Sequence, residues 1–404
     1  MSKEHIDRVG IEFYSRWKEF QLKNVASFSQ GIQVDPKDQK EVPFDNSVRF
    51  IRIVDFTKGT NEELRYIDNP GERYLVEEDD LVMIRYGSQT AGKIARGFKG
   101  AIANNTFKIS LNEDILNKNF VFYFLSQKSV FDYFHLSQAS STMPAITFDM
   151  IGNLDLLVPP IQEQTAIASI LSSLDDKIDL LHRQNKTLEQ LAETLFRQWF
   201  VEEAEESWEV EKLGKVFDIG IGRTPPRKEQ HWFTLNPNDV KWVSIKDMGT
   251  SGIYIDTVSE YLTPQAVEQY SVPVIPENTV MLSFKMTIGR LAISTEKMVS
   301  NEAIAHFKQK EGSSLFPEFL YLFLKTYSWV ELGSTSSIVE SINSQMIKDI
   351  EMAIPDEQKL NTFKDLIKPY FDKIRSNQTQ IRTLTQTRDT LLPKLMSGEV
   401  RVEM

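Results

Sequence analysis

The segment that decides the fold is residues 171–199, LSSLDDKIDLLHRQNKTLEQLAETLFRQW. Its core-type positions alternate at spacings of three and four, the a/d pattern of a helix that packs on another helix. These positions are Leu171, Leu174, Ile178, Leu181, Asn185, Leu188, Ala192, Leu195 and Trp199. A helix with a single apolar stripe must bury that stripe against a partner.

The same frame returns 196 residues later, in residues 367–395, IKPYFDKIRSNQTQIRTLTQTRDTLLPKL. Its a/d positions are Ile367, Tyr370, Ile374, Asn377, Ile381, Leu384, Arg388, Leu391 and Leu395. The obvious partner for each helix is therefore the other helix. The alternative is that each helix packs separately on its own globular domain.

An antiparallel pair is predicted, because copies related by a two-fold axis across the helices must run in opposite directions. Setting Asn185 opposite Asn377 fixes the register and places Trp199 opposite Phe363. A polar pair inside an apolar seam lowers stability but selects one register. In the same register Arg388 falls opposite Leu174, where we expect it to extend outward to solvent.

Proline at position 369 is expected to kink or interrupt the second helix near its start.

The globular parts of the chain are also repeated, which indicates two similar domains. Trp17, Leu22, Val25 and Gly31 recur with a constant shift as Trp208, Leu213, Val216 and Gly222, and Gly92-Lys93 recurs as Gly289-Arg290. Strands are predicted at 50–54, 80–84, 242–245 and 280–284, and buried aromatic helices at 120–125 and 319–324. The predicted boundaries are domain 1 at 1–157, spacer helix 1 at 158–203, domain 2 at 204–353, and spacer helix 2 with the C-terminal tail at 354–404.

The predicted fold class is therefore α+β. Two similar α/β domains are carried on an antiparallel two-helix coiled coil with pseudo-two-fold symmetry.

Composition favours a folded cytoplasmic protein. The chain has 404 residues, is 41% hydrophobic, and contains no cysteine, which excludes disulfides and thiolate metal sites and suits a reducing compartment. Its first residues contain no apolar signal core, and no apolar run approaches the roughly 18 residues of a membrane span. We therefore expect no membrane association.

The net charge of −11 argues against indiscriminate nucleic-acid binding, but the charge is unevenly distributed. Residues 81–112, 219–228 and 278–295 contain no acid and include several Arg and Lys residues at matching places in the two copies. These segments predict DNA binding. For phosphate contacts we predict Arg85, Lys93, Arg96, Lys99, Arg223, Lys285 and Arg290, and for base contacts Gln89, Asn104, Asn105 and Asn301.

Three segments resemble catalytic motifs but lack residues that those motifs need. Gly87–Lys93 resembles a phosphate-binding P-loop, but Ile94 stands where a Mg²⁺-binding Ser or Thr is needed. Residues 158–161 lack the polar and aromatic ends of an amino-methyltransferase motif, and residues 356–359 fit helix capping better than a nuclease site. The five histidines show no metal-ligand spacing. We infer that the chain catalyses no reaction itself and holds no metal.

The double copy, the Pro160-x-x-Glu163-Gln164 helix start, Gly222-Arg223-Thr224-Pro225 and the segment 286–292 together resemble the specificity subunit of type I restriction-modification systems. The resemblance covers essentially the whole chain. It implies two target-recognition domains on an antiparallel helical spacer, which bind a bipartite double-stranded DNA site. It also implies two modification (methyltransferase) subunits and restriction subunits as partners. S-adenosylmethionine, ATP and Mg²⁺ would be bound by those partners and not by this chain.

Three function classes remain open from the sequence. The chain is a non-catalytic recognition subunit, a methyltransferase or ATP-driven enzyme in its own right, or a helical adaptor or stand-alone DNA-binding protein. Binding of S-adenosylmethionine or ATP would favour the second class, and failure to bind DNA would favour the adaptor.

Overall fold

The structure is a computed structural model that describes residues 17–57, 63–136, 145–329 and 342–402. The N-terminal stretch in which the sequence predicts no signal core lies outside these residues. The chain forms two compact units. Unit 1 consists of Met1–Lys177 and Leu384–Met404, and unit 2 consists of Ile178–Thr383.

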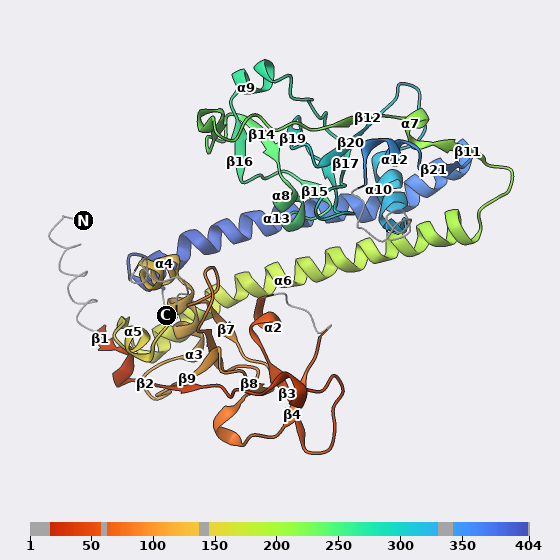
Figure 1. The fold of residues 1–404 in the computed structure, drawn as a ribbon. Helices are drawn as coiled ribbons and strands as arrows, with labels where there is room; N and C mark the ends of the chain where they lie inside the picture. Colours follow the sequence, from red (N-terminus) through yellow and green to blue (C-terminus); the bar gives the residue numbers. More distant parts are fainter. Residues whose placement is uncertain (1–16, 58–62, 137–144, 330–341, 403–404) are drawn as a thin grey trace. The chain divides into compact units, whose positions relative to one another are not determined.

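Unit 1 contains two four-stranded sheets (Figure 1). The first is antiparallel, in the order β2 (Ala26–Gln30), β9 (Thr106–Leu111), β6 (Leu81–Ile84), β7 (Ile94–Arg96). The second has the order β4 (Tyr66–Asp68), β3 (Ser47–Ile51), β8 (Gly100–Ile102), β5 (Leu75–Val76), with β3 and β8 parallel. A short ribbon pairs β1 (Lys18–Gln21) with β10 (Asp155–Val158), and the helices beside these sheets are α3 (Lys118–Ser126), α4 (Lys128–Leu136) and α5 (Phe148–Gly152).

Unit 2 repeats the central part of this topology, but its larger sheet has one additional strand and its second sheet has an edge strand on the opposite side. Its larger sheet has the order β12 (Phe217–Ile221), β20 (Ile304–Gln309), β17 (Val280–Ser283), β18 (Leu291–Ser294), β15 (Tyr254–Ile255). Its second sheet has the order β13 (Phe233–Thr234), β16 (Glu260–Leu262), β14 (Val240–Val243), β19 (Val299–Ser300), with β14 and β19 parallel. The ribbon of β11 (Glu209–Lys212) and β21 (Glu351–Ile354) matches β1 and β10, and the helices are α7 (Leu213–Val216), α8 (Ile245–Thr250), α9 (Pro264–Gln269), α10 (Pro317–Thr326) and α12 (Ser344–Lys348). The prediction of two similar domains is confirmed.

The aromatic helices are core, as predicted. In α3, Phe120, Val121 and Leu125 are buried, and in α10 Phe319 and Leu322 are buried. Long apolar side chains on one face of a helix cover the sheet and exclude water from it.

Two of the predicted strands end earlier than expected. β3 stops at Ile51 and a short helix, α2 (Ile53–Thr57), follows, whereas the sequence predicted a strand through Val54. The cause is Asp55, which is 4% exposed and whose Oδ2 accepts a hydrogen bond from the backbone N–H of Arg52 at 2.8 Å. In unit 2, Ser244 and Asp247 form a capping box that starts α8 directly after β14. Capping by a buried carboxylate outweighs the strand preference of the β-branched run.

The two long helices are α6 (Ile161–Arg197), which continues as a π-helical turn, η4 (Gln198–Glu202), and α13 (Glu357–Met396). They pack against each other antiparallel within each unit. In unit 2, Asn185 bonds Asn377, and the ring of Trp199 lies 5.6 Å from that of Phe363. In unit 1, Asp175 of α6 pairs with Arg388 of α13 at 2.8 Å. The alternative of two separately packed helices is therefore wrong.

Two details of the helix prediction need correction. Arg388 does not simply extend to solvent beside Leu174, because it forms ion pairs with Asp175 and Asp389. Pro369 does not interrupt the second helix, which is helical throughout Glu357–Met396. The apolar face around Pro369 is buried, with at most 1% exposure at each of Phe363, Ile367, Phe371 and Ile374. This burial stabilises the helix although Pro369 has no backbone N–H to donate to the preceding turn. None of the helices in the described part of the chain has both the length and the hydropathy of a membrane span.

Candidate nucleic-acid interface

A hairpin turn in unit 1 carries three of the predicted DNA-binding residues. It joins β6 to β7 and contains Arg85, Gln89 and Lys93. Gly92 has φ +85° and donates its N–H to the carbonyl of Ile84 at 2.8 Å. A Cβ on Gly92 would lie 2.8 Å from the ring of Phe134, so both the backbone conformation and the space require glycine. The turn leaves Gln89 and Lys93 exposed.

The matching hairpin in unit 2 joins β17 to β18 and is shorter. Gly289 has φ +87° and donates its N–H to the carbonyl of Ser283 at 3.0 Å. The hydroxyl of Ser283 donates to the carbonyl of Thr287 at 2.6 Å and accepts from the N–H of Arg290 at 3.0 Å. This arrangement presents Lys285 and Met286 to solvent.

A second turn lies beside each hairpin turn because the strands are in register. Ile84 at the end of β6 pairs with Thr106 at the start of β9, and Ser283 pairs with Ile304. The backbone N–H of Arg85 then bonds the carbonyl of Asn105 at 2.8 Å. We call residues 85–93 and 103–105 the first turn pair, and residues 284–289 and 301–303 the second turn pair. Each domain thus has one turn pair at the same edge of its larger sheet.

The chain segment after the first strand of each larger sheet passes directly over the turn pair. A Cβ on Gly31 would lie 2.3 Å from the carbonyl oxygen of Ala103, and one on Gly222 would lie 2.2 Å from that of Asn301. Glycine is therefore needed at both positions for the backbones to approach. The approach brings Gln33 to Asn104, whose Nδ2 donates to Gln33 Oε1 at 3.2 Å.

The predicted amides differ in their accessibility. Asn104 and Gln33 form an exposed amide pair whose remaining donors and acceptors match those that recognise adenine. Asn105 turns its Oδ1 inward, where that atom is buried and has no hydrogen-bond partner among the described residues. Asn301 uses its Oδ1 to accept from the N–H of Ala303 at 3.1 Å, which shapes the turn.

Two of the residues predicted to contact phosphate do not lie on a turn pair. Arg96 pairs with Leu81 in the β6–β7 ladder, so it lies at the opposite end of the hairpin from the turn. Its Nη1 donates to Asn119 Oδ1 at 2.6 Å, and its guanidinium lies 4.4 Å over the ring of Phe122. Lys99 is exposed in the connection beyond that same end.

In unit 2, two of the predicted arginines donate hydrogen bonds to backbone carbonyls of their own domain. Arg290 Nη1 donates to the carbonyl of Ile245 at 2.6 Å, and Arg223 Nη1 donates to the carbonyl of Tyr270 at 2.6 Å. Arg223 nevertheless lies beside the second turn pair, since its backbone N–H bonds the carbonyl of Ser300 at 2.9 Å. An acid stands there too, because Glu302 accepts a hydrogen bond from Thr224.

Sequence reasoning missed two apolar side chains on the second hairpin turn. Met286 is 96% exposed in a left-handed conformation with φ +60°, and Ile288 is 37% exposed. Single exposed apolar side chains are common on protein surfaces, but these two lie together on the second turn pair. The signal in the sequence is an apolar residue on either side of Thr287 within a basic, acid-free segment.

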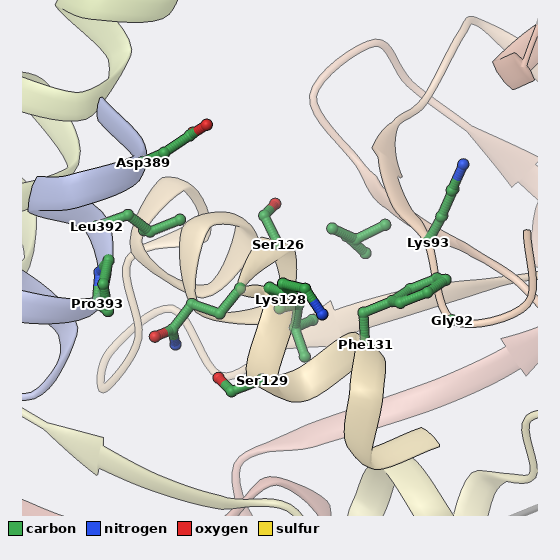
Figure 2. A pocket seen from close by; sticks show the side chains of 12 residues that line it. Gly92, Lys93, Ser126, Lys128, Ser129, Phe131, Asp389, Leu392 and Pro393 are labelled. Atoms are coloured by element: carbon green, nitrogen blue, oxygen red, sulfur yellow. The ribbon is translucent and has the colours of Figure 1, made fainter. Parts of the chain in front are cut away.

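A pocket of about 650 Å³ opens beside the first hairpin turn, within unit 1. Figure 2 shows Gly92 and Lys93 on its hairpin side, Lys128 and Phe131 on its α4 side, and Leu392 from α13. Its lining is mostly apolar.

Gly87–Lys93 leads into a strand rather than a helix, so it lacks the helix N-terminus of a P-loop. The described residues contain no group of three or more His, Asp or Glu placed to hold a metal ion.

The chain matches one protein family in comparisons with known proteins. The model of the type I restriction modification DNA specificity domain matches twice, at residues 14–190 and 205–386. The HindI type I restriction enzyme specificity subunit of Haemophilus influenzae is 25% identical over 370 residues, covering 72% of this chain and 79% of that protein. The MjaVIII specificity subunit of Methanocaldococcus jannaschii is 23% identical over 427 residues, covering 98% and 95%.

A solved structure shares the fold. The S subunit of a type I restriction-modification system from M. genitalium is 16% identical, covers 96% of each chain, and gives a TM-score of 0.55. Two copies of one domain in sequence agree with the two matched topologies in the structure. The chain therefore belongs to the family of type I restriction-modification DNA specificity proteins.

Proposed function

We propose that each domain of this specificity subunit reads one half of a bipartite DNA site through its turn pair. The observation that carries the proposal is the repetition: two domains of one topology present a basic hairpin turn and an adjacent second turn at the same edge of the sheet. Because the residues on the two turn pairs differ, the two half-sites should have different sequences.

Phosphate and base contacts divide naturally between the residues of each turn pair. Lys93 and Lys285 are exposed cations on backbone turns, which suits contacts to phosphate. Gln89 and the Asn104–Gln33 amide pair suit hydrogen bonds to base edges. Met286 and Ile288 suit apolar contacts, such as the methyl group of thymine.

The subunit chooses the sequence and leaves catalysis to its partners. We propose two modification subunits, which use S-adenosylmethionine, and restriction subunits, which use ATP and Mg²⁺. The α6–α13 pair would dock the modification subunits and set the number of unread base pairs between the half-sites. Two similar domains and one continuous pair of helices support this division.

Selection from random double-stranded DNA tests both parts of the proposal. The chain, assembled with modification subunits from the same genome, should select two fixed blocks separated by a gap of constant length. A contiguous block would contradict the bipartite site.

A second chain carries a heptad inserted between Ile178 and Leu181 in α6 and another between Ile381 and Leu384 in α13. Seven residues add about 10 Å of helix, or roughly three base pairs. The longer chain should select the same two blocks with a longer gap. An unchanged gap would show that the helices do not set it.

A further inference from the structure

A partly buried ion pair joins the two ends of the helix pair in unit 1. Glu163, the third residue of α6, is 8% exposed in its side chain and accepts hydrogen bonds from Arg401 Nη1 at 2.7 Å and from Trp17 Nε1 at 3.1 Å. The guanidinium of Arg401 lies 4.8 Å over the ring of Trp17. The start of α6 is thereby joined to the segment that follows α13.

Unit 2 contains the matching arrangement. Lys359, the third residue of α13, lies 3.1 Å from Glu205, in the segment that follows η4. The ammonium of Lys359 lies 4.7 Å over the ring of Trp208, the repeat counterpart of Trp17. The same two positions are used in both units, and a tryptophan lies against the cation in both.

The charges, however, are reversed between the two repeats. With the shift of 196 residues that relates the helices, Glu163 corresponds to Lys359 and Glu205 corresponds to Arg401. The first repeat, residues 1–206, therefore carries an acid at both positions. The second repeat, residues 207–404, carries a base at both positions.

This distribution opposes pairing of a repeat with a copy of itself. Two first repeats paired antiparallel would place Glu163 against Glu205 twice, and two second repeats would place Lys359 against Arg401 twice. Like charges in contact repel, whereas the mixed pair gains two attractions.

The seam between the helices shows the same bias. Asn377 is fully buried and bonds Asn185 in the mixed pair. The repeat counterpart of Asn377 is Leu181, and that of Asn185 is Ile381. In either self-pair, each asparagine would face a leucine or isoleucine and leave its amide unpaired, which destabilises a buried polar group.

A third contact adds to the bias. Asp175 pairs with Arg388, and the repeat counterparts of these residues are Phe371 and Ala192. A pair of second repeats would set Arg388 against Phe371 with no carboxylate from the paired helix, and a pair of first repeats would set Asp175 against Ala192. Each of these contacts is complete only when one helix comes from each repeat.

We infer that these residues form a pairing code by which the helix of each repeat accepts the other repeat and rejects a copy of itself. The code consists of Glu163–Arg401, Glu205–Lys359, Asp175–Arg388 and Asn185–Asn377. It ensures that two unlike domains remain combined, because symmetric assemblies of like domains are disfavoured. The inference does not depend on what the domains bind.

The test uses the folded full chain with a protease recognition sequence inserted between the exposed residues Glu206 and Ser207. After cleavage, samples with light and heavy isotopes are mixed and the fragment pairs are weighed by native mass spectrometry. The wild-type chain should exchange fragments only into mixed pairs, with one fragment from each repeat. Self-pairs at the statistical ratio would overturn the inference.

Two double variants, which share one substitution and leave the net charge unchanged, isolate the charge code. E205R/R401E exchanges the residues between repeats, so each repeat becomes complementary to itself and each mixed contact becomes repulsive. We expect self-pairs to replace most mixed pairs, less so at high salt, since Glu205 is 53% exposed in its side chain. E205R/K359E keeps both mixed contacts attractive but also makes each repeat complementary to itself, so that only the Asn185–Asn377 and Asp175–Arg388 contacts still favour the mixed pair. Mixed pairs should therefore be clearly more frequent in E205R/K359E than in E205R/R401E. Equal behaviour of the two variants would overturn the charge code.

Asn185→Leu provides a second test that does not alter charge. It removes the amide pairing of the mixed pair and gives two first repeats a fully apolar seam. We expect self-pairs of the first fragment to increase, while circular dichroism of the intact chain reports that the helices persist. Mixed pairs only, in both Asn185→Leu and E205R/R401E, would show that no code operates.

Discussion

Asn377 Nδ2 donates a hydrogen bond to Asn185 Oδ1 at 2.8 Å, inside a mostly apolar seam between α6 and α13. Asn377 is fully buried, and its Nδ2 also donates to Gln184 Oε1 at 2.9 Å. A buried amide of this kind stabilises one register by making all others leave it without partners.

Replacing one asparagine of this pair should cost more than replacing both. Asn185→Leu removes one of the two hydrogen bonds of the buried Asn377 Nδ2, leaving that to Gln184, and places hydrocarbon beside the amide. We expect a loss of about 1–3 kcal/mol in the free energy of unfolding. The double variant N185L/N377L fills the seam with apolar contacts and should recover most of this loss. Urea unfolding followed by circular dichroism measures both. A double variant less stable than Asn185→Leu would contradict this interpretation of the pair.

Gly92→Ala should destabilise the first hairpin turn and weaken DNA binding. The added Cβ meets Phe134 at 2.8 Å and the backbone has φ +85°, so we expect about 2 kcal/mol or more. Gly71→Ala is the matched control, because Gly71 has φ +95° but no atom within 4 Å of a Cβ. Thermal unfolding should show a clearly larger decrease for Gly92→Ala. Equal decreases would mean that the Phe134 contact is unimportant.

Lys93 and Lys99 separate the turn-pair hypothesis from a general effect of positive charge. Both are exposed lysines of one acid-free segment, but only Lys93 lies on the first turn pair. Lys93→Ala should reduce the affinity of the assembled complex for its DNA and lower the slope of log K against log salt by about 1. Lys99→Ala should leave both unchanged. Fluorescence anisotropy across a salt series measures the two slopes, and a loss confined to Lys99→Ala would place the interface elsewhere.

His306 should make the stability of unit 2 depend on pH. Burial, and then the nearby Lys308, lower the pKa of this imidazole from 6.5 to about 4, while Asp218 opposes the shift. The unfolded chain therefore binds more protons than the folded chain between pH 6.5 and 4, so stability falls as pH falls through this window. The full effect is on the order of 3 kcal/mol.

The substitution His306→Leu should remove this part of the pH dependence. Unfolding in urea at pH 7 and at pH 4.5 compares the two chains, and the carboxylates common to both cancel in the difference. A wild-type chain that loses no more stability than His306→Leu over this interval would contradict the assignment.

The repeated elements were predictable from sequence because the helix spacing and the recurrence of key residues at a constant shift are visible in the sequence itself. The spacing from Leu171 to Trp199 predicted a helix and its partner, and the recurrence of Gly31 as Gly222 predicted two similar domains. The ends of the strands were harder to predict from the sequence. Asp55 lies four residues after Ile51, and only the folded chain shows that its carboxylate caps α2.

The candidate interface was predictable only in part. The acid-free segment 81–112 crosses the larger sheet more than once, so its residues alternate between the two ends of the strands. Lys93 consequently lies on a turn pair while Arg96 lies at the other end, although three positions separate them in sequence. Gln33 lies far from Asn104 in the chain and joins it only because Gly31 allows a close backbone approach.

The central claim is that each domain reads its own half of the DNA site. Replacing residues 1–155 by the corresponding segment of a specificity subunit with a different target tests it most directly, with genomic methylation profiling as the measurement. We predict that one half-site takes the donor's sequence while the other half-site and the gap length are retained. A change in both half-sites, or in neither, would contradict the claim.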